Sequence, residues 1–455
     1  MNLLFNVVNK LGIDKSIAYS SGARIVQGVT GVGSVFFIST FLTGIEQGFY
    51  YTFGSILALQ VFFELGLTGI MQQYVAHEVS HLKLDANYLY QGEFKYRSRL
   101  ASLVRFCIKW YTILAFIAFI FLLLIGFVYF KKYGMVQAEN VSWKIPWILI
   151  CIATGVTIFQ SPFTAILRGL GYVKDMSKIS FLQQIIIPFC TWFGLFFGFK
   201  LYVIGIGYVL SVIIWLLYVC RNSLLIILVK LLKTEVNERV IYFKEIFPYQ
   251  WRIALSWVSG YFIFQLFNPV LFATEGAVVA GKMGMTLQAL NAIQSLSLSW
   301  QNTKVPLYSN LIALKQYEKL DVIFNKTLRQ MVLICCLLLF LCFGFIWILR
   351  ITQFELRGNV LADRFLDTIP LLLMSIPILT QQFVGSWATY LRCHKKEPYL
   401  INSIVGGLLC MISTIGLGYK FGLYGITMGY CCVQILLCIW AYRIYAAKKI
   451  EWHKK

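Results

Sequence analysis

Charged side chains are scarce in this sequence. Asp, Glu, Lys and Arg together make up 13% of the 455 residues, whereas 59% are hydrophobic. A soluble protein of this size carries about 25% charged residues, so the composition excludes an ordinary soluble enzyme or binding domain. Apolar runs of about twenty residues recur along the chain, which is long enough for a helix to cross a bilayer. The sequence therefore predicts an all-α integral membrane protein that crosses the membrane many times.

Acidic residues are the scarcer charged class, with 19 Asp and Glu against 40 Lys and Arg, which gives a net charge of +21. Nucleic-acid-binding proteins share such an excess, but here most basic residues lie in alternate loops between apolar runs. This is the positive-inside asymmetry of a membrane protein with both termini in the cytoplasm. Clusters such as Arg97, Arg99, Arg105 and Lys109 suit anionic lipid headgroups. We therefore expect membrane lipids, and no nucleic acid, as partners.

Signatures of catalytic and cofactor sites are also lacking. The sequence has no CxxC pair, and most of its 12 cysteines lie inside apolar runs, where cysteine acts as a small buried hydrophobe. A Gly-rich nucleotide loop, a nucleophile elbow and an Asp pair suited to sugar-nucleotide transfer are missing. The first residues do not form a signal peptide, so no cleaved leader is expected. We expect no cofactor, no metal, no ATP-driven transport and no enzyme activity.

Twelve apolar segments can be drawn as transmembrane helices. Their predicted bounds are 17–41, 48–76, 106–130, 144–167, 179–199, 201–221, 253–273, 276–301, 330–350, 367–391, 398–419 and 421–442. The longest basic linker divides the chain into an N-terminal six-helix lobe (1–229), a cytoplasmic linker (230–252) and a C-terminal six-helix lobe with a short basic cytoplasmic tail (253–455). Prolines are expected to interrupt several spans, at Pro188, Pro269, Pro370 and Pro377.

The two lobes look duplicated. Arg24-Ile25 matches Arg252-Ile253 at an offset of 252 − 24 = 228, and Gln60 matches Gln288 at 288 − 60 = 228. Glu46 meets Glu275 at 275 − 46 = 229. Because each half holds an even number of spans, the repeat would be parallel, with the substrate path between the halves.

Polar side chains form stripes on several predicted spans. The second span carries Gln60, Glu64, Thr68 and Gln72 at four-residue steps, which places them on one helical face. Similar stripes occur on the fourth, eighth and tenth spans: Thr154, Thr157, Ser161 and Thr164; Gln288, Asn291, Ser295 and Asn302; Ser375, Gln382, Ser386 and Thr389. Such residues also join packed membrane helices. Stripes at corresponding places in both halves favour a large hydrophilic lumen, with the third, sixth and ninth spans facing lipid.

Charged side chains inside the spans are the candidate functional groups. Arg24 and Arg252, one from each half, could converge on an anion, because the guanidinium fork binds phosphate with two hydrogen bonds at once. Lys282 could join them, although all three could instead reach the headgroups. Glu64 is a candidate proton or cation coupling site, or a structural partner of an arginine. Three amides complete the candidate substrate contacts, namely Gln60, Gln288 and Asn291.

One further motif suggests a metal but is better explained otherwise. His77-Glu78-Val79-Ser80-His81 matches the HExxH zinc pattern. A third ligand such as Glu275 would lie at the opposite membrane surface, about 30 Å away. We therefore interpret the motif as polar residues at the end of a membrane helix.

The second span and its flanks resemble bacterial polysaccharide flippases, which transport O-antigen and capsule repeat units. The resemblance rests on FLT at 41–43, EQGFYY at 46–51, LQVFFELGL at 59–67 and AHE at 76–78. Arg24 before a Gly-rich first span and the segment 162–171 are also similar. These proteins share a superfamily with lipid II flippases and multidrug extruders.

The resemblance implies a MATE-like fold of twelve transmembrane helices in two pseudo-symmetric six-helix lobes. It implies movement of an undecaprenyl-pyrophosphate-linked oligosaccharide from the inner to the outer leaflet of the bacterial inner membrane, for O-antigen and lipopolysaccharide synthesis. A cationic lumen would hold the headgroup while the lipid tail stays in the bilayer. A polysaccharide polymerase and a chain-length regulator would be partners.

Two other functions are compatible with such a chain. An ion-coupled multidrug extruder of the same fold would favour an anionic, aromatic-lined cavity, which the excess of cations disfavours. A membrane polysaccharide polymerase or ligase would need catalytic groups on a substantial external loop. The outer loops here are short, and Arg350, Arg357, Asp363 and Arg364 form no evident constellation.

Overall fold

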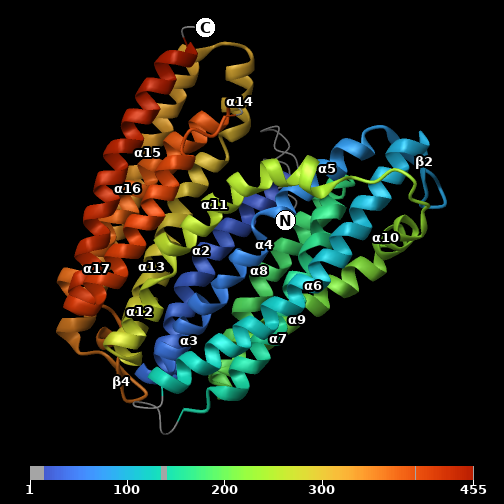
Figure 1. The fold of residues 1–455 in the computed structure, drawn as a ribbon. Helices are drawn as coiled ribbons and strands as arrows, with labels where there is room; N and C mark the ends of the chain where they lie inside the picture. Colours follow the sequence, from blue (N-terminus) through green and yellow to red (C-terminus); the bar gives the residue numbers. More distant parts are fainter. Residues whose placement is uncertain (1–14, 135–140, 395, 454–455) are drawn as a thin grey trace, which may run out of the picture.

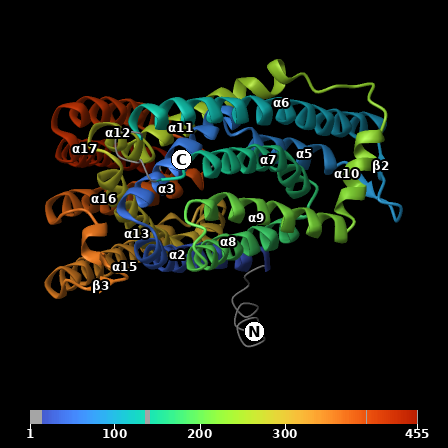
Figure 2. The same cartoon turned by 90° about the horizontal axis from the view of Figure 1, so that it is seen from below.

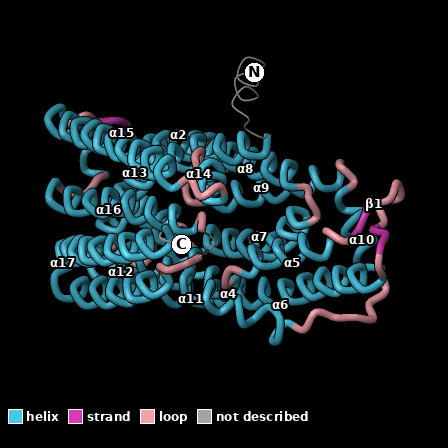
Figure 3. Tube along the Cα trace, turned by 90° about the horizontal axis from the view of Figure 1, so that it is seen from above, coloured by secondary structure: helices cyan, strands magenta, loops and turns pink. Residues whose placement is uncertain are grey.

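Two arms of helices diverge from a shared narrow end in the computed structural model (Figure 1). The structure describes residues 15–134, 141–394 and 396–453, with side chains of the first helix from Val26 onward. The narrow end carries the turns before α13 and α16, and the wide end carries the first hairpin, α10 and α14. Within the described residues, strands occur only as two short antiparallel hairpins, as the magenta segments of Figure 3 show for the first.

The first arm comprises the elements from α2 to α10. They are α2 (Lys15–Phe41), α3 (Gly44–Leu57), η1 (Ala58–Gln60), α4 (Val61–Glu64), α5 (Leu67–Val79), β1 (Leu82–Leu84), β2 (Tyr90–Gly92), α6 (Phe94–Tyr133), α7 (Lys144–Gly169), α8 (Val173–Phe196), α9 (Tyr202–Arg221) and α10 (Leu224–Lys233).

The second arm follows a linker that ends in a short π-helix. Its elements are η2 (Tyr242–Ile246), α11 (Phe247–Phe264), α12 (Phe267–Thr274), α13 (Ala277–Asn302), α14 (Val305–Ala313), α15 (Tyr317–Thr352), β3 (Glu355–Leu356), β4 (Asn359–Val360), η3 (Leu361–Arg364), α16 (Thr368–Arg392) and α17 (Leu400–His453).

Seven described helices are long and apolar enough to cross a membrane, and two bent pairs raise the number to nine. The protein is therefore a multi-pass membrane protein. The other predicted spans are helical as well. α2 covers the first span, α13 covers the eighth although it carries many polar residues, and α17 covers the eleventh and twelfth, with an interruption at Gly422, whose φ is 56°.

Both bent pairs have a local cause. The second span breaks where Leu65 and Gly66 adopt left-handed conformations, and the seventh breaks between α11 and α12, each with a bend of 41°. Pro269 explains the second break, because a proline ring clashes with the carbonyl of the residue four positions earlier, here Gln265. The expectation that the other prolines interrupt their spans is wrong for Pro188 and Pro377, which lie inside continuous helices. Pro370 lies in the first turn of α16, where proline is tolerated.

The helices of the two arms pack in matching pairs. In the first arm, α2 packs on α8, α6 on α7 and α5 on α7. In the second, α11 packs on α17, α15 on α16 and α13 on α16, which are the partners expected from a duplication. The arms meet through α13, which packs against both α2 and α3 (Figure 2).

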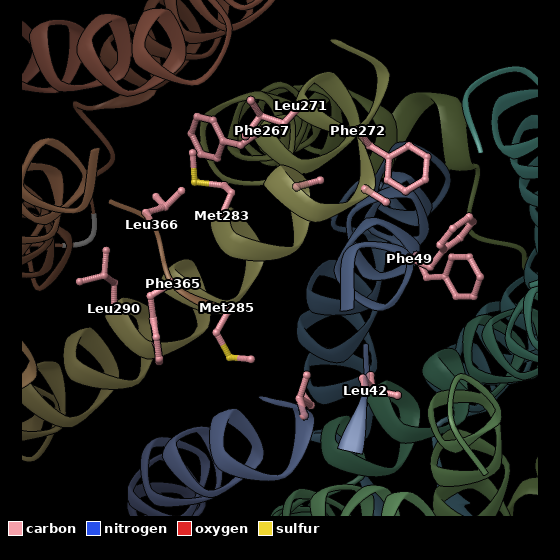
Figure 4. Packing of buried hydrophobic residues seen from close by; sticks show 14 of the residues in the cluster. Leu42, Phe49, Phe267, Leu271, Phe272, Met283, Met285, Leu290, Phe365 and Leu366 are labelled. Atoms are coloured by element: carbon pink, nitrogen blue, oxygen red, sulfur yellow. The ribbon is translucent and has the colours of Figure 1, made fainter. Parts of the chain in front are cut away.

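A large apolar core holds the narrow end together. It includes Phe49 and Phe130 of the first arm and Phe272 of the second, with the rings of Phe49 and Phe272 5.0 Å apart, and side chains of α12 and α13 extend it (Figure 4). Gly48 permits the closest approach, since a Cβ there would lie 1.9 Å from the Ala277 carbonyl oxygen. The two arms are therefore in backbone contact at this end.

Apolar side chains also cover the outside of the arms. Residues such as Phe116 and Val128 on α6, and Phe340 and Trp347 on α15, are mostly exposed, as expected for the third and ninth spans facing lipid. The same expectation for the sixth span, α9, is only partly right. Its Tyr208 also lines the internal cavity described next.

Candidate functional site

A cavity of about 490 Å³ lies between the arms. The first arm contributes α2, α3, α8 and α9, and the second contributes α11, α12 and α13. Its polar lining residues are Gln27, Thr30, Ser34, Tyr50, Tyr51, Ser55, Gln184, Thr191, Tyr208, Gln265, Asn268, Gln288, Asn291 and Ser295. The volume lies within the range of small-molecule sites, about 300–1,000 Å³.

A side pocket of about 210 Å³ adjoins this cavity within the first arm. It shares Gly54, Ile204 and Tyr208 with the main cavity and extends to Gln60 of η1. Two hydroxyls of α7, those of Thr154 and Thr157, complete its polar wall. Two of the four residues of the predicted polar face of the fourth span, Thr154 and Thr157, therefore open onto a pocket.

Amides and hydroxyls give the cavity its chemical character. The Tyr51 hydroxyl donates to Oε1 of Gln288 at 2.5 Å, and Nε2 of Gln288 donates to the Gly31 carbonyl at 3.2 Å. Gln288 thus joins the second arm to two helices of the first. None of the described lining residues is charged. Groups of this kind both donate and accept hydrogen bonds without selecting a charge.

The predicted substrate residues occupy different places. Gln288 and Asn291 line the main cavity, and Gln60 lines the side pocket. Arg252 is exposed on α11, where its guanidinium lies 5.6 Å from the ring centroid of Trp251. Lys282 is half-buried on α13 and is not among the described lining residues. The side chain of Arg24 lies outside the described residues, so its role stays a prediction.

The polar face of the tenth span is buried and does not line the lumen that we expected there. Ser375, Gln382 and Ser386 on α16 are 5%, 0% and 0% exposed. The Ser386 hydroxyl lies 2.5 Å from Oε1 of Gln301 on α13, and Nε2 of Gln301 donates to the Ser386 carbonyl. In the second arm the stripe joins two helices, which is the alternative use of such residues in membranes.

A polar latch closes the narrow end, and it was not foreseen. Arg364, which is 6% exposed, donates from Nη2 to the Leu42 carbonyl at 2.7 Å. Gln47 donates from Nε2 to the carbonyls of Gly281 (2.8 Å) and Arg364 (3.2 Å). These bonds join η3 and α13 of the second arm to α3 of the first and to the turn before it. We call Arg364, Gln47, Leu42 and Gly281 the narrow-end latch.

Two matching glutamates support the arms beside this latch. Glu46 forms a capping box with Thr43 at the start of α3 and pairs with Lys200, 2.8 Å from its carboxylate, in the turn between α8 and α9. Glu275 accepts the N–H of Leu423 at 2.5 Å, just after the break in α17. Each glutamate therefore ties the start of the second span of its arm to the turn between the fifth and sixth. This agrees with the offset seen in the sequence.

The linker is attached to the first arm at the wide end. Arg99 of α6 binds Glu78 at 3.0 Å and Glu245 at 2.7 Å, and the Tyr74 hydroxyl donates to the Glu245 carbonyl. Burial acts to raise the pKa of Glu245, but hydrogen bonds from Arg99 and the Ile241 N–H outweigh it and hold this pKa below its ordinary value. Ser98 accepts the N–H groups of Asn237 and Glu238.

The HExxH motif belongs to this attachment. Glu78 is buried and its carboxylate is bound by Arg99, while His77 is exposed and His81 stacks on Tyr96 at 4.0 Å between ring centroids. No group of three potential metal ligands lies together among the described residues. The glutamate therefore has a structural partner at the end of α5.

Comparison with known proteins identifies the fold. No protein-family model matches the sequence, and no curated protein sequence matches it. The structure is similar to that of a multidrug resistance MATE family transporter of the MOP superfamily in an inward-facing conformation, with a TM-score of 0.69, 13% identity and 96% of each chain covered. The chain has the fold of the MOP-superfamily transporters.

Two further structures support the same fold. The lipid II flippase MurJ in an inward closed conformation has a TM-score of 0.57 and 12% identity, covering 93% of this chain and 86% of its own. A MOP-superfamily transporter from Pyrococcus furiosus has a TM-score of 0.51 and 16% identity, with 97% of each chain covered. These neighbours are transporters and flippases rather than enzymes, and the MATE-like fold class predicted from the sequence is confirmed.

Proposed function

We propose that this protein is a flippase that moves undecaprenyl-pyrophosphate-linked oligosaccharide repeat units across the bacterial cytoplasmic membrane. Movement would run from the inner to the outer leaflet by alternating access, driven by an ion gradient or the membrane potential. The observation that carries the proposal is the uncharged cavity between the arms. Its amides, hydroxyls and phenols match sugar hydroxyl groups, which likewise donate and accept hydrogen bonds. Tyrosine rings also offer apolar faces for the C–H surfaces of a sugar ring.

The orientation in this proposal follows from charge. The wide end carries Lys83, Lys95, Lys230, Lys244 and Lys396, so the positive-inside rule places it in the cytoplasm. Both termini would then be cytoplasmic, in the inner membrane. The narrow-end latch would face outward and close the cavity on that side, while the arms diverge toward the cytoplasm (Figure 1).

The charged residues receive a separate role. Arg24 precedes Gln27, a cavity residue, by one helical turn on α2, and Arg252 lies toward the wide end of α11. We propose that Arg24, Arg252 and Lys282 act on the pyrophosphate while Gln60, Gln288 and Asn291 contact the glycan. We also propose that residues 230–252 form the linker between the two lobes. A polysaccharide polymerase and a chain-length regulator would be partners of the protein.

Leaflet location of the lipid-linked unit tests this function. A deletion strain complemented with the double variant Gln288→Leu and Asn291→Leu should lose surface polysaccharide and accumulate single repeat units on the inner leaflet. The matched control is Gln353→Leu, an exposed amide outside the cavity, which should restore export. Accumulation of repeat units on the outer leaflet would instead point to a polymerase and would reject the proposal.

A multidrug extruder is the second candidate function, since multidrug MATE transporters share the fold. The observation in its favour is the set of aromatic rings around the cavity, including Tyr50, Tyr51, Tyr208 and Phe264. No acidic residue is among the described lining residues, which disfavours organic cations. Drug susceptibility of the deletion strain separates the two functions. Unchanged susceptibility together with lost surface glycan supports the flippase.

A further inference from the structure

The four histidines of the chain form two pairs. His77 and His81 belong to the first arm, with ring centroids 5.8 Å apart, and both side chains are exposed. His394 and His453 belong to the second arm, with ring centroids 5.7 Å apart, and both are half-buried. We call His394 and His453 the C-terminal histidine pair. Imidazole changes its charge between pH 5 and 8, so this pair can change charge inside a packed contact.

His453 ends α17 and contacts two other helices of the second arm. Its ring stacks on Tyr317, which begins α15, at 4.1 Å between centroids. The hydroxyl of Tyr390 on α16 donates to Asp321 of α15 at 2.7 Å. The oxygen of this hydroxyl lies 3.2 Å from Nε2 of His453, from which it accepts. Lys449, one turn before His453, binds the Asp321 carboxylate at 2.8 Å. The last turns of α17 are thus fastened to both α15 and α16.

His394 follows α16 and packs beside this contact. Its ring centroid lies 5.2 Å from that of Trp452, and its Nδ1 donates to the Tyr390 carbonyl at 3.2 Å. Its Nε2 is buried and makes no hydrogen bond with the described residues. A neutral imidazole leaves this nitrogen as an unused acceptor, whereas an imidazolium would bury an N–H donor without a partner. The contact therefore favours the neutral ring.

The charged groups around the C-terminal histidine pair come from every element of the contact. Lys396, in the turn after α16, and Lys449 of α17 are the basic groups that act on the pair, and Asp321 of α15 is the acidic one. Arg392 and Glu397 nearby form an ion pair with each other at 2.6 Å. The two tyrosines of the contact stay neutral below pH 8. Because Lys449 already binds Asp321, added positive charge on the rings is poorly compensated.

Protonation of the pair therefore opposes docking of α17. Burial is the largest cause that holds the pKa of His394 and of His453 below the ordinary value of 6.5, and the neighbouring lysines add to it. A lowered pKa means that the docked state binds fewer protons than the released state. Docking is thus strongest above pH 6.5 and weakens as the pH falls through the lowered pKa values.

We propose that the C-terminal histidine pair is a pH-sensitive clamp, which holds residues 446–453 of α17 against α15 and α16 at neutral pH and releases them on acidification. The C-terminus lies at the wide end (Figure 1), which faces the cytoplasm in the orientation proposed above. The clamp therefore responds to cytoplasmic pH. Its release frees the basic end of α17, which carries Lys448 and Lys449. This inference goes beyond the transport function and holds for any substrate.

Hydrogen–deuterium exchange of the full-length protein, purified without a histidine tag, tests the clamp. Exchange is compared at about pH 5 and about pH 7.5, with labelling times scaled to the intrinsic exchange rate at each pH. Residues 446–453 of the wild type should lose protection at the lower pH. The double variant His394→Gln and His453→Gln should stay protected at both, because glutamine also donates hydrogen bonds but carries no charge. The matched control, His77→Gln with His81→Gln, should respond like the wild type.

The control variant also gives a measurement that leaves the clamp unaltered. It keeps only two histidines, so its imidazole NMR signals report the protonation of the C-terminal histidine pair directly. Both signals should titrate in the pH range in which protection is lost. The proposal is overturned if the wild type is equally protected at both pH values, if the double variant of the pair keeps the wild-type response, or if the two signals titrate in another range. No glycan is used, so failure of the flippase function would leave this result intact.

Discussion

The polar face of α7 opens onto a pocket, whereas the matching face of α16 is buried inside the second arm. Thr154 and Thr157 line the side pocket, but Gln382 and Ser386 are fully buried, and Ser386 lies against Gln301 of α13. The two arms nevertheless share the same helix pairings and the same glutamate brace at Glu46 and Glu275. The two arms therefore keep the same framework, while the polar face opens onto a pocket in one arm and joins helices in the other.

Gly48→Ala should have the largest effect on the packing between the two arms, because Gly48 lies where the arms touch. The new Cβ would lie 1.9 Å from a backbone carbonyl that cannot rotate away, so we expect a loss of about 3 kcal/mol from the inter-arm contact. Hydrogen–deuterium exchange in α3 and α13 should increase. The control is Gly54→Ala on the same helix, where a Cβ meets no atom within 4 Å. Equal exchange in both variants would contradict close packing at Gly48.

Arg364→Gln tests the narrow-end latch and should weaken the contact between the arms less than Gly48→Ala does. The change removes a charge-assisted hydrogen bond to the buried Leu42 carbonyl, which costs about 2 kcal/mol. The narrow end should open more often, and exchange at the start of α3 should rise while the cores of both arms stay protected. Arg350→Gln is the control, since Arg350 binds Leu366 and Thr368 within its own arm. If Arg350→Gln opens the narrow end as much, the latch is not specific to Arg364.

Gln382→Met and Gln60→Leu compare the buried polar residues of the second arm with the pocket-lining residues of the first. Gln382 is 0% exposed and neither amide atom makes a hydrogen bond with the described residues, so an apolar side chain should raise stability by about 1 kcal/mol. Thermal unfolding in detergent measures this gain, and export should be unaffected. Gln60→Leu removes an amide from the side pocket and should reduce export without stabilising the fold. The opposite pattern would mean that the second arm holds the binding surface.

The smallest effect concerns the attachment of the linker. A lowered pKa means that Glu245 stabilises the folded state above its unfolded pKa, about 4.3, and that this contribution is lost as pH falls through the folded value. Because the ion pair is partly exposed, Glu245→Gln should cost only about 0.5 kcal/mol at neutral pH. Limited proteolysis of the linker should speed up slightly in this variant. Glu235→Gln should not change it, and at low pH the wild type and Glu245→Gln should be cleaved alike.

The sequence predicted the positions of the helices better than the contacts between them. The eighth span was predicted as 276–301 and is Ala277–Asn302, because its polar stripe and flanking turns have a clear helical period. Gln288 and Asn291 were likewise placed in the cavity. Gln382 was misplaced, since a polar stripe looks the same whether it faces water or a neighbouring helix.

The latch could not be read from the sequence. Gln47 and Arg364 are 317 positions apart, and Arg364 ends the short helix η3, where no periodicity marks it. Gly48 and Gly281 are the positions at which the helices touch, because small residues let membrane helices approach closely. The neutral character of the described cavity wall was also missed. The formal charge of the spans says nothing about which of their faces turns inward.

The π-helix at Tyr242–Ile246 has a mechanical consequence. Residues 232–245 are fastened to α6 by Ser98, Arg99 and Arg105, so this stretch moves as part of the first arm. Helix α11 begins directly afterwards, at Phe247. Any swing of one arm against the other must therefore be absorbed between Glu245 and Phe247, where the π-helix ends and α11 begins. The covalent tether between the arms is thus a pivot at a fixed place, and lengthening it elsewhere in the linker would leave the swing unchanged.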